Sequence, residues 1–134
     1  MKLKLGQVNT LTVVKSVDFG MYLDGGEAGE ILLPQRYVPQ GCQPGDELDV
    51  FIYLDSEERL IATTQMPLAV VGDFAYLKVA WVNNYGAFLD WGLAKDLLLP
   101  FKEQTARVHA GDDALVTLYI DKSERLCATM NVYQ

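Results

Sequence analysis

The sequence has few of the side chains from which catalytic and metal sites are usually built. It contains one histidine, His109, and two cysteines, Cys42 and Cys127, among its 134 residues. Neither a CxxC nor an HExxH motif occurs, so a zinc site lacks its ligand set. A lone histidine in an expected loop is usually a solvated side chain. We therefore expect no enzyme activity, no metal and no other cofactor.

Long apolar runs and an excess of basic residues are also missing. No apolar stretch approaches the ~18–20 residues that span a bilayer, and the basic start of the chain leads into no apolar signal core. The net charge is −7, from 18 acidic and 11 basic residues, which disfavours tight non-specific binding to nucleic acid or to an anionic membrane. The two cysteines fit free thiols in the cytoplasm. We expect a cytoplasmic protein without membrane contact.

What the chain has instead is an internal repeat, because residues 6–65 and 72–131 are the same stretch written twice without a gap. Matching pairs are Gly20 with Gly86, Asp24 with Asp90, Pro34 with Pro100, Asp46 with Asp112 and Arg59 with Arg125. A repeat of this length is a whole small domain. The sequence therefore predicts one domain at residues 1–65 and a second at residues 66–134.

Each copy alternates apolar and polar residues with period two and is rich in β-branched and aromatic residues, which is typical of β-strands. The expected strands lie near 6–17, 19–24, 29–33, 46–55 and 58–64, and near 72–83, 85–90, 95–99, 112–121 and 124–130. Five strands with a long connection after the third match an OB-fold barrel. The fold class is thus all-β, with two tandem five-stranded OB-fold barrels. Because the linker is short and apolar, we expect the barrels to pack on each other.

Paired aromatic residues are the first candidate for a binding site. Residues 19–22 read Phe-Gly-Met-Tyr, and their copy at 85–88 reads Tyr-Gly-Ala-Phe. Rings three positions apart fall on opposite faces of a regular strand, but a bulge at the glycine would bring them to one side. Two outward rings form a platform on which nucleobases stack. The alternative, that the rings belong to the core, stays open.

The last hairpin of each copy carries a second candidate, the pair Asp55 with Arg59 and its copy Asp121 with Arg125. If these hairpins lie beside the aromatic strands, each arginine can meet a phosphate or stack on a base while the aspartate orients it. The alternative is that each pair is a hairpin salt bridge worth less than ~1 kcal/mol. Both interpretations remain open from the sequence.

The combined pattern resembles a known family. In the first copy it runs Gly-x-Val, Phe-Gly-x-Tyr-Leu-Asp, Gly-Glu-Ile-Leu-Leu-Pro, Gly-Asp, Asp and Arg-Leu in order. This pattern resembles the S1 domain, the RNA-binding barrel repeated in ribosomal protein S1. More narrowly, residues 24–39, 45–64 and 86–93 resemble the bacterial CvfB/YitL family. The resemblance covers essentially the whole chain.

The resemblance implies an RNA-binding regulator of gene expression built from tandem S1 domains. By position it assigns the nucleic-acid-binding face to Phe19, Tyr22, Asp55 and Arg59, and in the second copy to Tyr85, Phe88, Asp121 and Arg125. The S1 motif usually has a histidine where Pro34 and Pro100 stand, so we expect weak binding of single-stranded RNA. Members of the CvfB/YitL family are longer, continuing into a further S1-like domain and a winged-helix domain. The chain therefore resembles a fragment or a short relative.

Two functions stay open: RNA binding without catalysis, and a structural unit that docks on a partner or on other domains of a longer chain. The second copy is the less acidic one, so it is the preferred RNA binder. The basic residues that make it less acidic are Lys78, Lys95, Lys102 and Arg107. Trp81 and Trp91 occur in the second copy alone. For them, burial in the seam between the barrels is preferred over stacking on a ligand.

Overall fold

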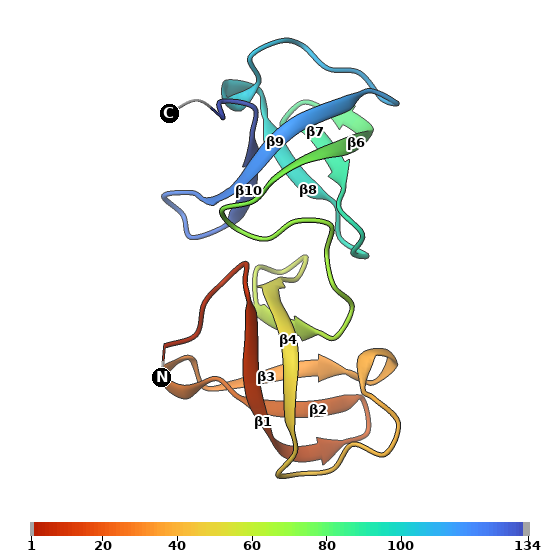
Figure 1. The fold of residues 1–134 in the computed structure, drawn as a ribbon, viewed down its shortest axis with the longest axis vertical. Coiled ribbons are helices and arrows are strands. Elements are labelled where there is room, and N and C mark those ends of the chain that lie inside the picture. The colour runs from red at the N-terminus through yellow and green to blue at the C-terminus, as the bar shows by residue number, and fades with distance from the viewer. Residues whose placement is uncertain (1, 133–134) are drawn as a thin grey trace. The chain divides into compact units, whose positions relative to one another are not determined.

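The structure is a computed structural model that describes residues 2–132 of the chain. The all-β prediction is confirmed: the described residues form ten strands and three short 3₁₀ helices, without an α-helix. None of these helices is long and apolar enough to cross a membrane. The chain divides into two compact units between Met66 and Pro67. In Figure 1 the first unit runs from red to yellow-green and the second from green to blue.

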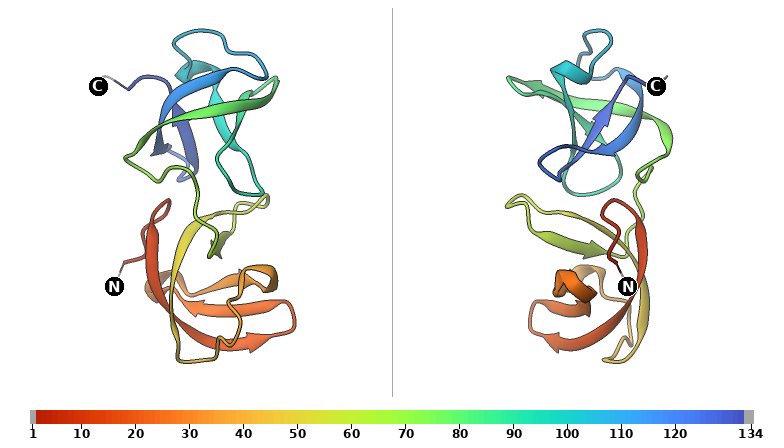
Figure 2. Two further views of the ribbon diagram at one scale, coloured as in Figure 1. Left: turned by 45° about the vertical axis from the view of Figure 1, so that its right-hand side comes forward. Right: turned by 90° about the vertical axis from the view of Figure 1, so that its left-hand side faces the viewer.

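The first unit is a closed five-stranded barrel in which the strands follow the order β1-β2-β3-β5-β4. The strands are β1 (Val8–Val17), β2 (Gly20–Asp24), β3 (Glu30–Pro34), β4 (Glu47–Leu54) and β5 (Leu60–Thr63). Neighbouring strands are antiparallel except β3 and β5, which pair in parallel at Leu32 and Ile61. Figure 2 shows the long β1 and β4 running side by side in both views. Closure leaves no exposed sheet edge, which protects the barrel from edge-to-edge association.

The second unit repeats this order as a five-stranded sheet, β10-β9-β6-β7-β8. Its strands are β6 (Phe74–Asn83), β7 (Gly86–Asp90), β8 (Leu97–Pro100), β9 (Asp113–Ile120) and β10 (Leu126–Thr129). β8 and β10, the two ends of the sheet, also lie beside each other, so the sheet is rolled like the first barrel. Short 3₁₀ helices occur at Gly26–Ala28, Gln35–Tyr37 and Phe101–Glu103. The prediction of two OB-type barrels is confirmed.

Alternation along the strands determines which side chains form the two cores. In β2, Met21 and Leu23 are buried while Tyr22 between them is partly exposed, and β7 shows the same pattern around Phe88. The first core consists of Leu11, Val13, Met21, Leu23, Ile31, Leu33, Val50, Ile52 and Ala62. Cys127 is buried in the second unit, at the repeat position that Ile61 holds in the first, and packs there as a small apolar side chain. The strands therefore turn one aromatic ring of each motif away from the core.

The segment that joins the two repeats is bound to the second unit. The backbone N–H of Leu68 donates to the carbonyl oxygen of Trp91 at 2.8 Å, and Val71 forms a parallel bridge with Leu118. Trp91 itself is buried, and its indole Nε1–H donates to the carbonyl oxygen of Lys95 at 2.5 Å. Backbone groups of this segment are therefore bonded to the second unit, whereas the backbone of a flexible linker would be hydrated.

Candidate nucleic-acid interface

The first barrel brings its two predicted rings together at the surface. Phe19 lies in the two-residue loop between β1 and β2 and is 57% exposed, and Tyr22 follows on the outer face of β2. Their ring centroids are 6.2 Å apart with an interplanar angle of 88°, an edge-to-face pair. Because Phe19 lies in the turn rather than in the strand, strict alternation does not separate the two rings.

The irregularity beside these rings lies in β1, so the prediction of a bulge at the glycine is wrong. Val13 pairs with Leu23 and Lys15 pairs with Tyr22, which leaves Val14 as an extra residue in β1. The bulge turns Lys15 to the outer face opposite Tyr22, with its Nζ 5.2 Å from the ring centroid. Glycine is needed at position 20 for another reason. Its φ is +152°, and a Cβ there would lie 2.2 Å from the carbonyl oxygen of Leu33.

The second barrel has the same bulge, and there it creates a pair of stacked rings. Val79 pairs with Leu89 and Trp81 pairs with Phe88, so Trp81 takes the place that Lys15 holds in the first barrel. The Trp81 and Phe88 rings are parallel within 5° and their centroids are 4.0 Å apart. Trp81 is 45% exposed, which makes the expectation of a buried residue wrong. Its Nε1–H donates to Oδ2 of Asp96 at 2.9 Å and fixes the ring orientation.

Tyr85 completes the aromatic face of the second barrel. It occupies the two-residue loop between β6 and β7, where Phe19 lies in the first barrel, and is 74% exposed. Its backbone N–H donates to Oδ1 of Asn83 at 2.8 Å, which holds the loop. The outer face of this domain thus carries three rings: Trp81, Tyr85 and Phe88. Trp81 is absent from the site predicted by sequence, because its orientation depends on a bulge and not on the alternation along the strand.

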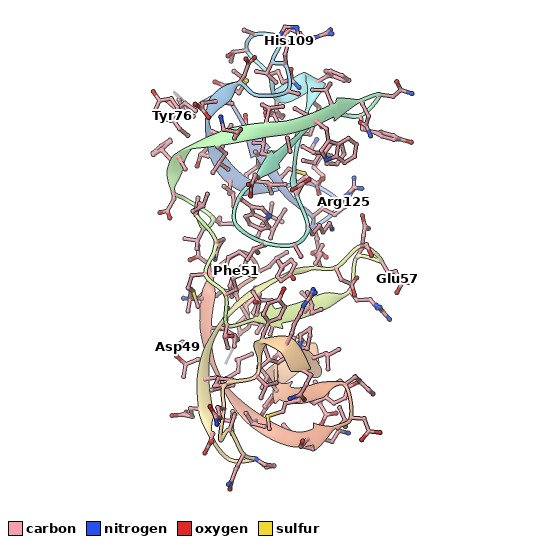
Figure 3. The ribbon with its side chains drawn as sticks, turned by 90° about the vertical axis from the view of Figure 1, so that its right-hand side faces the viewer. Asp49, Phe51, Glu57, Tyr76, His109 and Arg125 are labelled. Atoms are coloured by element: carbon pink, nitrogen blue, oxygen red, sulfur yellow. The ribbon has the colours of Figure 1, made fainter. Side chains whose placement is uncertain are left out.

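Asp55 organises the β4–β5 hairpin in the first barrel. Its carboxylate accepts the backbone N–H groups of Glu57 and Arg59, each at 2.9 Å, and Nε of Arg59 at 3.1 Å. A second carboxylate, that of Glu57, pairs with the Arg59 guanidinium at 2.5 Å. Figure 3 shows Glu57 at the tip of this hairpin. Asp55 therefore acts as a turn residue, and the charge of Arg59 is shared with two acids.

The corresponding hairpin of the second barrel keeps the aspartate but lacks the second acid. Oδ1 of Asp121 accepts the backbone N–H groups of Ser123 and Arg125 at 2.8 and 2.9 Å, and Nε of Arg125 lies 3.5 Å from Oδ2. Ser123 stands where the first barrel has Glu57. The Arg125 side chain, labelled in Figure 3, is 48% exposed. The ion pair predicted as an alternative is present in both hairpins, and each arginine still presents its head to solvent.

The pKa values of these aspartates follow from their hydrogen bonds. Partial burial acts to raise the pKa of Asp55, but hydrogen bonds from the Arg59 and Glu57 backbone and from the Arg59 side chain outweigh it and hold the pKa below its ordinary value. The pKa of Asp121 is lowered in the same way. Burial and then the nearby Asp121 raise the pKa of the Cys127 thiol to about 11, so this thiol remains protonated at neutral pH.

A lowered carboxyl pKa predicts an acid-dependent stability. The ionised Asp55 stabilises the native hairpin fully above about pH 5, and this contribution is lost as the pH falls through and below about pH 4. In Asp55→Asn, which keeps an oxygen acceptor but cannot titrate, we expect a lower Tm at pH 7 and a smaller fall in Tm between pH 5 and pH 3. The measurement is a series of thermal melts across this range.

Asp18→Asn serves as the control for this series, because the exposed Asp18 accepts no hydrogen bond among residues 2–132. Its acid-induced fall in Tm is expected to match that of the unmodified chain. Equal pH profiles for Asp55→Asn and Asp18→Asn would contradict the role assigned to Asp55.

Three further residues considered in the sequence analysis are Pro34, Pro100 and His109. Pro34 and Pro100 are partly exposed and pair with Gly20 and Gly86 at the ends of their strands. His109 is exposed in the β8–β9 connection, 3.7 Å from Asp112, and is labelled in Figure 3. Within residues 2–132, no group of three or more His, Cys, Asp and Glu side chains is placed to hold a metal ion.

The family model of the S1 domain matches this chain twice, over residues 5–65 and 71–131. The chain belongs to the S1 domain family. Its two S1 domains cover the two barrels described above, and the resemblance inferred from the sequence motifs is confirmed.

Two relatives of the chain come from bacteria. The chain is 38% identical to the uncharacterized protein YitL of Bacillus subtilis over 95 residues, which are 70% of this chain and 32% of YitL. It is 29% identical to the conserved virulence factor B of Staphylococcus saprophyticus over 133 residues, covering 94% of this chain and 44% of that protein. The predicted kinship with the CvfB/YitL family is thereby confirmed. The chain spans less than half the length of these relatives.

A solved structure from Streptococcus pneumoniae has the same fold. It is described as a multidomain protein with nucleic acid binding domains, and it matches 96% of this chain and 46% of its own length with a TM-score of 0.79. The sequence identity is 21%. At this level of identity the match establishes the fold of the two S1 domains.

Proposed function

We propose that the two S1 domains bind single-stranded RNA on their outer aromatic faces, without catalysis, with the second domain as the stronger binder. The observation that carries this proposal is the surface group of Trp81, Phe88 and Tyr85, of which two rings are stacked and one is 74% exposed. Exposed rings cost solvation free energy unless a ligand covers them, and nucleobases stack on such rings with little sequence preference. The match to the S1 domain model and the Streptococcus structure described with nucleic acid binding domains support a nucleic acid as the ligand.

Each predicted site residue has a role in this proposal. The rings of Phe19, Tyr22, Tyr85 and Phe88 receive bases, while Arg59 and Arg125 approach the phosphates. Asp55 and Asp121 hold the arginines through the hairpin hydrogen bonds rather than contacting RNA. RNA is preferred over duplex DNA because rings on a convex surface require unpaired bases. We further propose that the whole protein acts in the cytoplasm as a regulator of gene expression, which is what the sequence resemblance to the CvfB/YitL family implies.

In the first domain, the cations beside the rings are paired with acids. In the first domain, Lys15 pairs with Glu30 at 3.2 Å, and Arg59 pairs with two carboxylates. In the second, an aromatic residue replaces Lys15 and a serine replaces the second acid of the hairpin. Paired cations release fewer counterions when RNA binds. The first domain should therefore contribute less to affinity.

A second function has its own supporting observation. The acids beside the rings of the first domain, together with the net charge of −7, suit a surface that contacts protein rather than RNA. In this alternative the first domain docks on a partner or on further domains of a longer chain. The two functions differ in what they predict for the first domain: Phe19→Ala with Tyr22→Ala weakens RNA binding under the first and leaves it unchanged under the second.

Fluorescence titration with a labelled oligoribonucleotide at several salt concentrations tests the proposal. We expect binding that weakens with salt, with a slope of log K against log [salt] of about 0.7 for each phosphate neutralised. The control is a duplex DNA of equal length, which presents no unstacked bases and should bind more weakly. Absence of RNA binding at low salt would refute the proposed function.

A further inference from the structure

A further exposed ring and an arginine follow β8, the strand that pairs with β7. Phe101 begins the 3₁₀ helix Phe101–Glu103, directly after β8, and is 38% exposed. The guanidinium carbon of Arg107 lies 5.1 Å from the centroid of the Phe101 ring, within the range of a cation–π contact. The β8–β9 connection that carries both residues projects from one end of the second unit in Figure 2. Neither residue belongs to the site that the S1 motif assigns.

The strand register places the backbone of Phe101 near that of Tyr85, and Arg107 joins this place through its contact with the Phe101 ring. Gly86 in β7 pairs directly with Pro100 in β8, and Tyr85 and Phe101 are the residues that flank this pair on the two strands. Opposite residues of an antiparallel ladder have Cα atoms about 4.5–5.5 Å apart. Tyr85 and Phe101 are the chain neighbours of this pair, so their backbones start from neighbouring points at the end of the sheet.

The charge of Arg107 is available at this place. Among the residues that the structure describes, no carboxylate lies within ion-pair distance of its guanidinium, whereas Lys15 and Arg59 in the first domain are both held by acids. The corresponding positions of the first domain hold Gln35 and Gly41, which provide neither a ring nor a charge. An arginine stacked on a ring can contact a phosphate with its donors and a base with its face.

We propose that Phe101 and Arg107 form an additional nucleotide subsite next to Tyr85, so that the second domain holds a longer stretch of single strand than its S1 motif residues alone. A base stacks beside Phe101, and the Arg107 guanidinium contacts the phosphate that joins this nucleotide to the one at Tyr85. This inference rests on the proposed RNA binding and extends it to residues that are specific to the second domain.

The experiment compares oligouridylates of three and six nucleotides by fluorescence anisotropy, using the full chain. The quantity of interest is the ratio of the two affinities, since the additional subsite is filled by the longer strand. Variants are Arg107→Ala, Phe101→Ala and Arg107→Lys, which keeps the charge but loses the planar stack. Arg36→Ala is the matched control, because Arg36 also lies over a ring, that of Tyr37, at 4.9 Å and carries the same charge.

For Arg107→Ala and Phe101→Ala we expect the hexamer-to-trimer ratio to fall by about fivefold, and for Arg107→Lys by a smaller factor. Arg107→Ala should also lower the salt slope for the hexamer by about 0.7. Circular dichroism at neutral pH checks that each variant is folded, and Arg107→Ala, at an exposed position, keeps the test valid if Phe101→Ala unfolds.

The outcomes separate the subsite from the proposed function. If the hexamer binds and Tyr85→Ala with Phe88→Ala weakens it while Arg107→Ala behaves like Arg36→Ala, the subsite is overturned and the proposed function stands. If the unmodified chain binds neither oligonucleotide at low salt, both are overturned. The subsite is supported if the hexamer-to-trimer affinity ratio falls in Arg107→Ala and in Phe101→Ala but stays unchanged in Arg36→Ala.

Discussion

Replacing Tyr85 and Phe88 together with alanine is expected to weaken the binding of single-stranded RNA by about 30-fold, which corresponds to roughly 2 kcal/mol of lost base stacking. Two causes combine in this effect. The Tyr85 ring is itself a platform, and the Phe88 ring supports Trp81 from 4.0 Å, so its removal leaves the indole without its stacking partner. The fold should survive, because both side chains point away from the core that contains Leu89. Isothermal titration calorimetry or fluorescence titration with an oligoribonucleotide measures this change in affinity.

The matched control lies on the same domain. Phe74 and Tyr76 are exposed aromatic residues of β6 that precede the bulge and lie outside the proposed face, and Tyr76 is labelled in Figure 3. Phe74→Ala with Tyr76→Ala removes a similar amount of exposed ring and should change the affinity less than twofold, within ordinary measurement scatter for surface changes. If both double variants bind equally well, or if both lose affinity equally, the aromatic face is not the RNA site.

Replacing Gly86 with alanine is expected to lower the free energy of unfolding of the second domain by roughly 3 kcal/mol. The backbone at Gly86 has φ of +146°, and a Cβ would lie 2.4 Å from the carbonyl oxygen of Leu99 and 2.9 Å from Cα of Pro100. Neither backbone atom can move without opening the pairing of β7 with β8. Because Tyr85 directly precedes this glycine, the substitution should disturb the RNA face as well.

Urea unfolding followed by tryptophan fluorescence measures this loss, since both tryptophans, Trp81 and Trp91, lie in the second domain. Gly111→Ala is the control: its φ of +92° imposes a similar backbone cost, but its Cβ would meet no atom within 4 Å. We expect about 1 kcal/mol for Gly111→Ala. If Gly86→Ala lowers the free energy of unfolding no more than Gly111→Ala does, the clash of the added Cβ with β8 contributes nothing. That result would contradict the prediction.

Much of the fold could be predicted, because the period-two pattern that marks the strands occurs at matching positions in both copies of the repeat. The expected strand at 46–55 is observed at Glu47–Leu54, and the one at 112–121 at Asp113–Ile120. Deviations occur at strand ends, where solvent rather than packing determines the backbone. The segment expected at 58–64 begins at Leu60, because the preceding residues form the turn that Asp55 holds.

The candidate site was harder to predict, because the orientation of a side chain depends on register as well as on local pattern. Glycine at positions 20 and 86 suggested a bulge there, but the extra residue lies one strand earlier, in β1 and in β6. The pleat alone would turn Trp81 inward along with Val79, and the bulge turns it outward. The repeat could have revealed this, since the copy has the solvent-seeking Lys15 at the same position.

Two-dimensional NMR of the indole groups, recorded during a titration with single-stranded RNA, tests the central claim most directly. The chain has two tryptophans, and each indole N–H has its own acceptor: Asp96 for the surface residue Trp81 and the carbonyl oxygen of Lys95 for the buried Trp91. We predict that the Trp81 signal moves progressively with RNA while the Trp91 signal stays in place. A Trp81 signal that remains fixed while RNA binds, or a larger shift at Trp91, would contradict binding on the outer aromatic face.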